Sequence, residues 1–575
     1  MKRVVIIGAV ALGPKVASRL RRLDPDAEIT LVDKDSIISY GGCGIPYYVG
    51  GDIADIEGLF STASHVKRDI EFFRSCKGIK VMSRVEATCI DRKKKRVHIK
   101  NLADGIEDTL DYDKLVISTG TSPLKPPVKG ADLPDVQTVS NLHHAKALKD
   151  KIAGGRIEKA VVIGAGAIGI EMAEALCDLW GVETTLIEMA DQVMPYAVGK
   201  NMARIAENHL KENGVNVLTG EKVSRINADG NNRVVSVDTE NDTIECDVVV
   251  LSTGVKPNTE LAADAGLAVG KSGGILVNRR MQTTDPDIYA GGDCVELLNL
   301  VSGEHMLMPL GSLANRQGRV IAANINGGAS RFRGTVGTFC IKIFEMGFAR
   351  SGLTVQQAKA AGFDPVHSIV TQHDRAHFYP EAKLMYITLI SDRKSRRVLG
   401  IEAAGRQKDA VKARVDAVAP LLSDNTDVDE ICCLETGYAP PCASAMDIIN
   451  NAGNVLDNIL NGNNRPVDGA DFLKEFKTGK TRVLDVRENN ESIPFSREYE
   501  GRRISIPQSE LRQRYTELPD DEFLYILCGT GARSYEAQVF LDGKGIVNTL
   551  NIQGGYGTLM ATDPDFVSNP DGGRV

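Results

Sequence analysis

The chain has 575 residues, too many for one hydrophobic core, and we expect roughly three to five domains. Its formal net charge of −8 argues against a nucleic-acid partner, and no apolar run is long enough to span a bilayer. The 11 cysteines lack the spacing of a disulfide framework or a zinc site, and no signal-peptide pattern precedes the first strand. We therefore expect a cytoplasmic protein with no membrane segment and no bound metal.

The first predicted unit is a strand at 2–7, a turn that holds Gly8 and Gly13, a helix, and a second strand that ends at Asp33. Turn glycines, a helix N-terminus for a pyrophosphate and an acid for a ribose hydroxyl make up a dinucleotide-binding βαβ unit. Val10 replaces the middle glycine of the motif. An ordinary strand–helix turn therefore stays open as the alternative.

A glycine-rich loop at 39–48 follows this unit and holds one cysteine, Cys43. Glycines allow a backbone to approach a flat ligand closely. At the start of a helix, a thiolate is stabilised by the helix dipole and by free N–H groups. The loop alone leaves two interpretations open, a reactive thiol and a small buried residue without chemistry.

A second strand–turn–helix unit begins at residue 159, and its turn has all three glycines of the motif, Gly164, Gly166 and Gly169. The strand after its helix ends at Glu188. A carboxylate at this position bonds the ribose 2′-hydroxyl and repels a 2′-phosphate, which favours NADH over NADPH.

Two more buried strands run into glycine turns, one at Ser118-Thr119-Gly120 and one at Gly254. A later segment at 283–293 ends in Gly292-Asp293, where the carboxylate can accept hydrogen bonds from ligand hydroxyls. These motifs, in this order over roughly residues 1–450, resemble the flavoprotein disulfide reductases that bind two dinucleotides.

The resemblance implies that the first unit binds FAD, that the second binds NAD(H), and that the Asp293 segment returns to the flavin. The positions that it assigns to the two cofactors are Gly8, Val10, Ala11, Gly13, Asp33, Lys34, Ser118, Thr119, Gly120, Gly164, Gly166, Gly169, Glu188, Gly254, Gly292, Asp293 and Pro309.

The loop at 39–48 has no second cysteine, because Ile38 and Tyr48 stand five residues either side of Cys43. A lone cysteine in this loop resembles the branch with coenzyme A-disulfide reductases, NADH oxidases and persulfide reductases. In that branch the cysteine alone cycles with the flavin. It cycles as a mixed disulfide or persulfide with a substrate thiol, or as a sulfenic acid.

Residues 331–450 match the position of a dimerisation domain that lends residues to the active site of a second subunit. By resemblance, Tyr379 and Tyr438 are the tyrosines that reach the redox cysteine and donate hydrogen bonds to sulfur. A half-buried aromatic side chain with a satisfied hydroxyl is the alternative for each.

Coenzyme A carries a 3′-phosphate-ADP group, so its site needs cations. The positions that the resemblance assigns to the substrate are Lys15, Arg19, Arg22, Ser39, Gly42, Lys67 and Asn315. Solvated charge on a helix surface is the alternative for the cations. Met446 stands where the family places a lysine, so the pocket suits either coenzyme A, with Lys15 as compensation, or a different thiol.

Near the C-terminus, a strand ends in Asp485-Val486-Arg487, and another stops at a loop that runs from Cys528 to Arg533 before a helix. This loop resembles the active loop of rhodaneses, and a phosphatase-like loop is the alternative. N–H groups at the helix N-terminus and the charge of Arg533 favour a Cys528 thiolate that holds a sulfane sulfur. The segment 499–507 departs from the rhodanese pattern, which puts its contacts with the loop in doubt.

The predicted fold class is α/β, with two Rossmann-like dinucleotide-binding domains, an α+β dimerisation domain and a C-terminal rhodanese-like α/β domain. The expected domains are 1–150 (FAD, first part), 151–275 (NAD(H)), 276–330 (FAD, return segment), 331–450 (dimerisation), 451–465 (linker) and 466–575 (rhodanese-like).

The expected activity is NADH-driven, FAD-dependent reduction of sulfur–sulfur bonds in a coenzyme A persulfide, a polysulfide or coenzyme A disulfide. Cys43 is the expected redox thiol, Cys528 the expected sulfane carrier, and the homodimer the expected assembly. Two alternatives stay open: an NADH oxidase or peroxidase that uses a Cys43 sulfenic acid, and a non-catalytic redox sensor or sulfur carrier.

Overall fold

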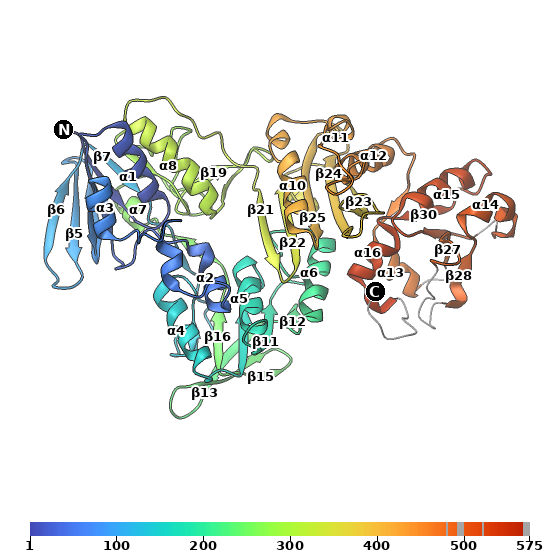
Figure 1. Ribbon diagram of the computed structural model, residues 1–575, viewed down its shortest axis with the longest axis horizontal. Coiled ribbons are helices and arrows are strands. Elements are labelled where there is room, and N and C mark those ends of the chain that lie inside the picture. The colour runs from blue at the N-terminus through green and yellow to red at the C-terminus, as the bar shows by residue number, and fades with distance from the viewer. Residues whose placement is uncertain (479–480, 492–499, 520–521, 567–575) are drawn as a thin grey trace. The chain divides into compact units, whose positions relative to one another are not determined.

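The computed structural model describes residues 1–478, 481–491, 500–519 and 522–566 (Figure 1). The chain divides into two compact units, Met1–Asp191 with Gly214–Thr335, and Gln192–Asn213 with Val336–Val575. Within the described part, no helix is both long and apolar enough to cross a membrane.

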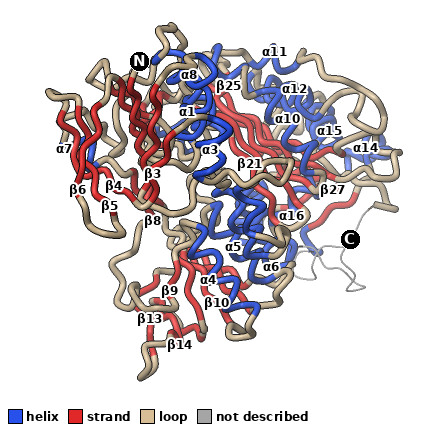
Figure 2. The backbone as a smooth tube through the Cα atoms, turned by 60° about the vertical axis from the view of Figure 1, so that its left-hand side comes forward, coloured by secondary structure: helices blue, strands red, loops and turns tan. Residues whose placement is uncertain are grey.

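The first unit contains a parallel sheet with the strand order β18-β7-β1-β2-β3. Its strands are β1 (Arg3–Ile7), β2 (Glu28–Asp33), β3 (Lys80–Ser83), β7 (Lys114–Ile117) and β18 (Ile288–Ala290). Four consecutive residues of β1 are buried, as expected of a parallel strand that is covered on both faces. Helices α1 (Leu12–Leu23) and α8 (Gly311–Ile325) pack against each other beside this sheet (Figures 1 and 2).

A second parallel sheet in the same unit has the order β12-β11-β10-β16-β9. Its strands are β9 (Val136–Gln137), β10 (Lys159–Ile163), β11 (Glu183–Glu188), β12 (Asn216–Thr219) and β16 (Val248–Leu251). The helix α5 (Ala167–Cys177) packs on β10 and β11. Both sheets thus contain the same strand–turn–helix–strand arrangement, β1-α1-β2 in the first and β10-α5-β11 in the second.

Smaller elements complete the first unit. Two three-stranded antiparallel sheets are β4 (Val85–Asp91), β5 (Arg96–Asn101) and β6 (Glu107–Asp111), and β13 (Val223–Ala228), β14 (Val234–Thr239) and β15 (Thr243–Glu245). Two-stranded pairs are β8 (Thr121–Pro123) with β17 (Val255–Pro257), and β19 (Glu296–Leu298) with β20 (His305–Leu307). The helices are α2 (Ile45–Gly50), α3 (Ile70–Lys77), α4 (Leu142–Ala153) and α7 (Glu260–Asp264).

The second unit contains an antiparallel sheet with the order β21-β22-β25-β24-β23. Its strands are β21 (Phe339–Ile343), β22 (Met346–Gly352), β23 (Pro365–His373), β24 (Leu384–Asp392) and β25 (Val398–Gly405). The helices of this part are α6 (Lys200–Glu212), α9 (Val355–Ala360), α10 (Lys408–Val418), α11 (Val428–Cys432) and α12 (Ile448–Leu460). The strand β23 is an edge strand, and its ladder runs to β24 alone.

The C-terminal part of the second unit is a parallel sheet with the order β26-β30-β29-β27-β28. Its strands are β26 (Pro466–Val467), β27 (Arg482–Asp485), β28 (Arg503–Ser505), β29 (Leu524–Leu527) and β30 (Thr549–Ile552). The helices are α13 (Gly469–Thr478), α14 (Gln508–Arg514), α15 (Ala532–Asp542) and α16 (Gly555–Thr562). The predicted fold class is confirmed by these sheets.

The segment expected to be a linker, 451–465, is mostly helix. Asp447 caps α12 by accepting a hydrogen bond from the Ile449 N–H at 3.1 Å. Ile448, Ala452 and Leu456 recur at helical spacing and are buried, and α12 packs on β23. The many asparagines of this segment mark its polar face and do not indicate a flexible connection.

Candidate functional site

The first dinucleotide turn is closed so tightly that only glycine fits at two positions. Gly8 has φ +100°, and a Cβ there would stand 2.1 Å from the Ser118 carbonyl oxygen. A Cβ on Gly13 would stand 1.9 Å from the Gly8 oxygen. Asp33 accepts a hydrogen bond from the Ala9 N–H at 2.6 Å, and burial raises the pKa of its carboxyl group. The turn is thus held between two strand ends.

The second turn repeats this construction. A Cβ on Gly164 would stand 2.6 Å from the Ser252 oxygen, and one on Gly169 would stand 1.9 Å from the Gly164 oxygen. At Gly166 a Cβ would meet nothing within 4 Å, so the backbone there faces open space. Glu188 accepts hydrogen bonds from the Ala165 N–H at 2.8 Å and from the Ala190 N–H at 2.9 Å. Open space at a helix N-terminus beside a carboxylate fits a dinucleotide.

The other predicted cofactor positions differ in their surroundings. Ser118 Oγ donates to the Ile7 oxygen at 2.7 Å and Thr119 Oγ1 to the Asn258 oxygen at 2.6 Å, so both hydroxyls tie strands together. Gly120 and Gly254 have positive φ angles of 65° and 105°. Val10, Ala11, Lys34 and Pro309 are half-buried or exposed in their loops.

The return segment brings Asp293 beside the first sheet. Gly292, with φ +79°, donates its N–H to Gln317 Oε1 on α8 at 2.7 Å. Burial raises the pKa of the Asp293 carboxyl group. Asn315, on the same helix, donates its side-chain amide to the Gly311 oxygen at 2.8 Å.

Cys43 lies in a 3₁₀ turn, Gly42–Gly44, directly before α2. Its side chain is exposed, yet desolvation by the surrounding protein and then the charges of Glu171 and Asp293 raise the pKa of its thiol. These surroundings oppose the thiolate that the helix start was expected to favour, so the reactivity of Cys43 stays a prediction.

Two residues near Cys43 had no role in the sequence analysis. Tyr47 donates its hydroxyl to Glu171 Oε1 at 3.5 Å, and burial and that carboxylate raise the pKa of the tyrosine. Both line a pocket of about 200 Å³ between α2 and α5, with Asp52, Glu174 and Asp178 on its wall. Glu171 lies two residues after Gly169, the last glycine of the second turn. This nearness to a dinucleotide turn was the signal in the sequence that could have marked it as a site residue.

The predicted substrate cations divide into two groups. Lys15, Arg19 and Arg22 share one face of α1, because they are spaced by four and three residues. Lys67 is paired with Glu57 at 2.5 Å on the surface. Ser39 is buried with φ +53°, whereas Gly42 is exposed.

In the second unit, the segments of the two predicted tyrosines lie side by side. The Ala376 N–H donates to the Pro440 oxygen at 3.3 Å, and Ser444 Oγ donates to the Arg375 oxygen at 3.0 Å. Tyr379 is half-buried, while the Tyr438 side chain is 54% exposed. An exposed tyrosine of this kind is available to a ligand or to a second subunit.

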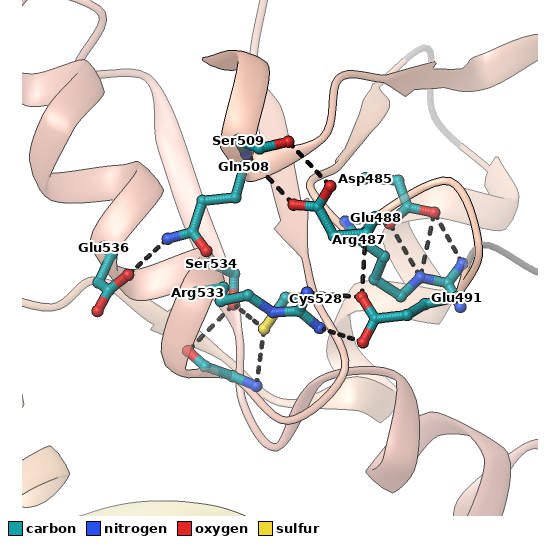
Figure 3. Close-up of polar contacts among 11 residues, drawn as sticks. Asp485, Arg487, Glu488, Glu491, Gln508, Ser509, Cys528, Arg533, Ser534 and Glu536 are labelled. Atoms are coloured by element: carbon teal, nitrogen blue, oxygen red, sulfur yellow. Dashed lines mark hydrogen bonds and ion pairs between the residues drawn. The ribbon is translucent and has the colours of Figure 1, made fainter. Parts of the chain in front are cut away.

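Cys528 lies where β29 ends, and its side chain has no exposed surface. Its Sγ accepts hydrogen bonds from the Gly531 N–H at 3.0 Å and from Ser534 Oγ at 3.2 Å (Figure 3). A Cβ on Gly555, the first residue of α16, would stand 2.5 Å from the Cys528 oxygen, so the start of α16 packs closely against this loop. The loop therefore presents one backbone N–H and one hydroxyl group to the sulfur.

Ion pairs surround this loop (Figure 3). Arg533 makes a bidentate pair with Glu491 at 2.6 and 3.1 Å, and the hydrogen bond between them raises the pKa of Arg533. Arg487 bonds Asp485 at 2.7 Å. In the doubtful segment 499–507, Tyr499 lies outside the described residues, and Arg503 bonds Asp485 at 3.1 Å.

The C-terminal sheet is joined to the edge strand β23 by polar contacts. Gln553 Oε1 accepts the Ile369 N–H at 2.9 Å, and its Nε2 donates to Asp468 at 2.9 Å. The hydroxyls of Thr371 and Thr558 are 2.7 Å apart. The unpaired edge of β23 is thus covered within the same unit.

Comparison with known proteins assigns the family. Residues 2–318 match the model for pyridine nucleotide-disulphide oxidoreductases. This chain belongs to the pyridine nucleotide-disulphide oxidoreductase family. Residues 339–448 match the dimerisation domain of that family, and residues 468–561 match the rhodanese-like domain.

Three relatives place this oxidoreductase further. A solved NAD-dependent persulfide reductase from A. fulgidus is 40% identical with a TM-score of 0.91, and the match covers 98% of this chain and 100% of the other. An NAD(P)H sulfur oxidoreductase (CoA-dependent) of Pyrococcus abyssi is 33% identical over 78% of this chain and 96% of its own length. An NADH oxidase of Methanocaldococcus jannaschii is 34% identical over 76% of this chain and 95% of its own length.

Family membership makes the chain an FAD- and NAD(P)H-dependent oxidoreductase. The tight turns at Gly8 and Gly164 and the open space at Gly166 fit these dinucleotides, because a pyrophosphate needs close backbone approach and N–H donors. When bound, FAD carries electrons from the nicotinamide to the thiol site.

Proposed function

We propose that this chain is an NADH-driven reductase of sulfur–sulfur bonds, with Cys43 as the redox thiol and Cys528 as a carrier of sulfane sulfur. One observation carries the proposal. A single-cysteine loop beside dinucleotide turns and a cysteine loop that presents one backbone N–H and one hydroxyl group to sulfur occur in one chain. The persulfide reductase that matches along 98% of the chain supports this pairing.

Cys43 would reduce a persulfide in two steps. Its thiolate attacks the outer sulfur of R–S–SH, so that a bond from Sγ to that sulfur forms, the substrate S–S bond breaks and the thiol RSH leaves. Two electrons from NADH then cleave the new bond. In total, RSSH, NADH and H⁺ give RSH, H₂S and NAD⁺, and Cys43 returns to its starting state.

The protein around Cys43 affects the pKa of its thiol. Desolvation, and then the charges of Glu171 and Asp293, raise that pKa, so a bound group that adds positive charge or hydrogen bonds would favour the attacking thiolate. We propose that the Lys15, Arg19 and Arg22 face of α1 holds the phosphates of coenzyme A. We also propose that the exposed Tyr438 segment of a second subunit completes the Cys43 site.

The test compares NADH consumption with five oxidants: coenzyme A persulfide, glutathione persulfide, polysulfide, coenzyme A disulfide and oxygen. We expect a persulfide or polysulfide to give the highest kcat/KM, and Cys43→Ser to abolish that turnover. Cys76→Ser, at an exposed cysteine on α3, is the matched control. If Cys43→Ser keeps full activity, the proposed role of Cys43 is wrong.

An NADH oxidase is the second candidate, because one relative at 34% identity carries that name. That match covers 95% of the relative but 76% of this chain, so about a quarter of this chain has no counterpart in it, whereas the persulfide reductase matches along 98%. Turnover with oxygen and with no persulfide would establish the oxidase instead.

A further inference from the structure

The charged side chains in the network around Cys528 balance in sign. Its described members are the acids Asp485, Glu488 and Glu491 and the bases Arg487, Arg503 and Arg533, of which Figure 3 labels all but Arg503. With all of them ionised, the three acids offset the three bases. These groups therefore leave no cation in excess beside the loop.

Each guanidinium group of this network is already engaged with a carboxylate. Arg533 lies over the loop, since a Cβ on Gly529 would stand 3.2 Å from its Nη2, and Glu491 holds it through two hydrogen bonds. Arg487 bonds Asp485 and stacks over the Tyr556 ring at 4.3 Å. Arg503 also bonds Asp485.

Two contacts hold the Glu491 carboxylate beside Arg533. Its Oε2 accepts the Glu488 N–H at 3.1 Å in addition to the Arg533 guanidinium. The hydrogen bond from Arg533 lowers the pKa of its carboxyl group, so Glu491 stays ionised at neutral pH. The charge of Arg533 is thereby neutralised beside Cys528.

This arrangement distinguishes two classes of sulfur donor. Thiosulfate carries two negative charges at its reacting end, and its leaving group, sulfite, carries two as well. Such a donor needs an unpaired cation next to the attacking sulfur. A persulfide of a small thiol carries at most one charge at the transferred sulfur, which the Gly531 N–H and Ser534 Oγ can stabilise.

We propose that Cys528 accepts sulfur from persulfides of small thiols and rejects thiosulfate, and that Glu491 sets this choice by neutralising Arg533. The Cys528 thiolate attacks the outer sulfur of R–S–SH. The bond from Sγ to that sulfur forms, the donor S–S bond breaks, and the thiol RSH leaves with the proton, with no net oxidation or reduction. The inference rests on the proposed function for the fate of the sulfur, but the transfer itself needs no NADH.

The test uses the full-length chain with Cys43→Ser, so that NADH chemistry does not contribute. Mass spectrometry follows the gain of one sulfur atom at Cys528 with glutathione persulfide or with thiosulfate as donor. We expect loading from the persulfide and little from thiosulfate. Glu491→Gln keeps the shape and removes the charge, and it should raise the ratio of thiosulfate to persulfide loading by about tenfold or more.

The matched control is Glu517→Gln, which removes a carboxylate paired with Arg514 on the exposed end of α14 and should leave the ratio unchanged. Equal loading from both donors in the starting chain, or an unchanged ratio in Glu491→Gln, overturns the inference. If persulfide loads Cys528 but the chain with intact Cys43 fails to oxidise NADH with any persulfide, the inference stands and the proposed reductase fails.

Discussion

The contact between the rhodanese-like domain and the edge strand β23 can be tested at one side chain, Gln553. This side chain is 4% exposed and serves both partners, since it accepts the Ile369 N–H and donates to Asp468. Gln553→Ala removes both hydrogen bonds. The Ile369 N–H then stays buried with no ladder partner, because β23 pairs with β24 through its other edge.

The cost follows from the two groups left behind. An unsatisfied buried N–H costs about 1–3 kcal/mol, and losing the second hydrogen bond adds about 0.5–1.5 kcal/mol. We therefore expect the local opening free energy at Ile369 to fall by about 1.5–4.5 kcal/mol. Since about 1.4 kcal/mol is a factor of ten, amide hydrogen exchange at Ile369 should accelerate about tenfold or more.

Hydrogen exchange with residue resolution measures this directly. Gln508→Ala is the control, because Gln508 is only half-buried and its side chain bonds Glu536 at 2.5 Å in a solvent-exposed contact. Its effect should stay within about 0.5 kcal/mol. Unchanged exchange at Ile369 in Gln553→Ala would refute the view that this side chain caps the edge of β23.

Two other substitutions test single carboxylates. Glu402 is buried, which raises the pKa of its carboxyl group to about 7 against the opposing charge of Arg350. The folded state then holds a proton that the unfolded state releases, so stability falls as pH rises towards 7. Glu402→Gln should remove this slope in urea unfolding between about pH 5 and 8, and a slope that persists assigns it to other groups. Glu188→Gln should raise the kcat/KM ratio of NADPH to NADH by about tenfold, because the charge that repels a 2′-phosphate is gone. An unchanged ratio would remove the selectivity role from Glu188.

The two dinucleotide-binding units could be predicted from the sequence because their signals, a strand followed by a glycine turn and a helix, are local. At Gly8, Gly13 and Gly164 a Cβ would clash with a backbone carbonyl oxygen 1.9–2.6 Å away, so each position excludes other residues. The stretch 451–464 was predicted as a helix that leads into a linker. The structure has the helix as α12, and the helical spacing of the buried residues Ile448, Ala452 and Leu456 accounts for it.

The electrostatics of the sites could not be predicted in this way. Glu171 and Asp293 act on Cys43 from segments far away in the chain, and no local pattern shows that they converge. Glu491 bonds Arg533 across 42 residues in the same manner. Motifs therefore located both cysteines, whereas the charges that govern them depend on tertiary packing.

The two cysteines differ in a way that suits different tasks. Cys43 is exposed, as a thiol must be when it meets a dissolved substrate at every turnover. Cys528 has no exposed surface and is surrounded by N–H and hydroxyl donors, so a sulfur bound to it is shielded from bulk reductants. Sulfur that enters or leaves Cys528 should therefore travel on a small thiol, and a direct exchange between folded protein surfaces is disfavoured.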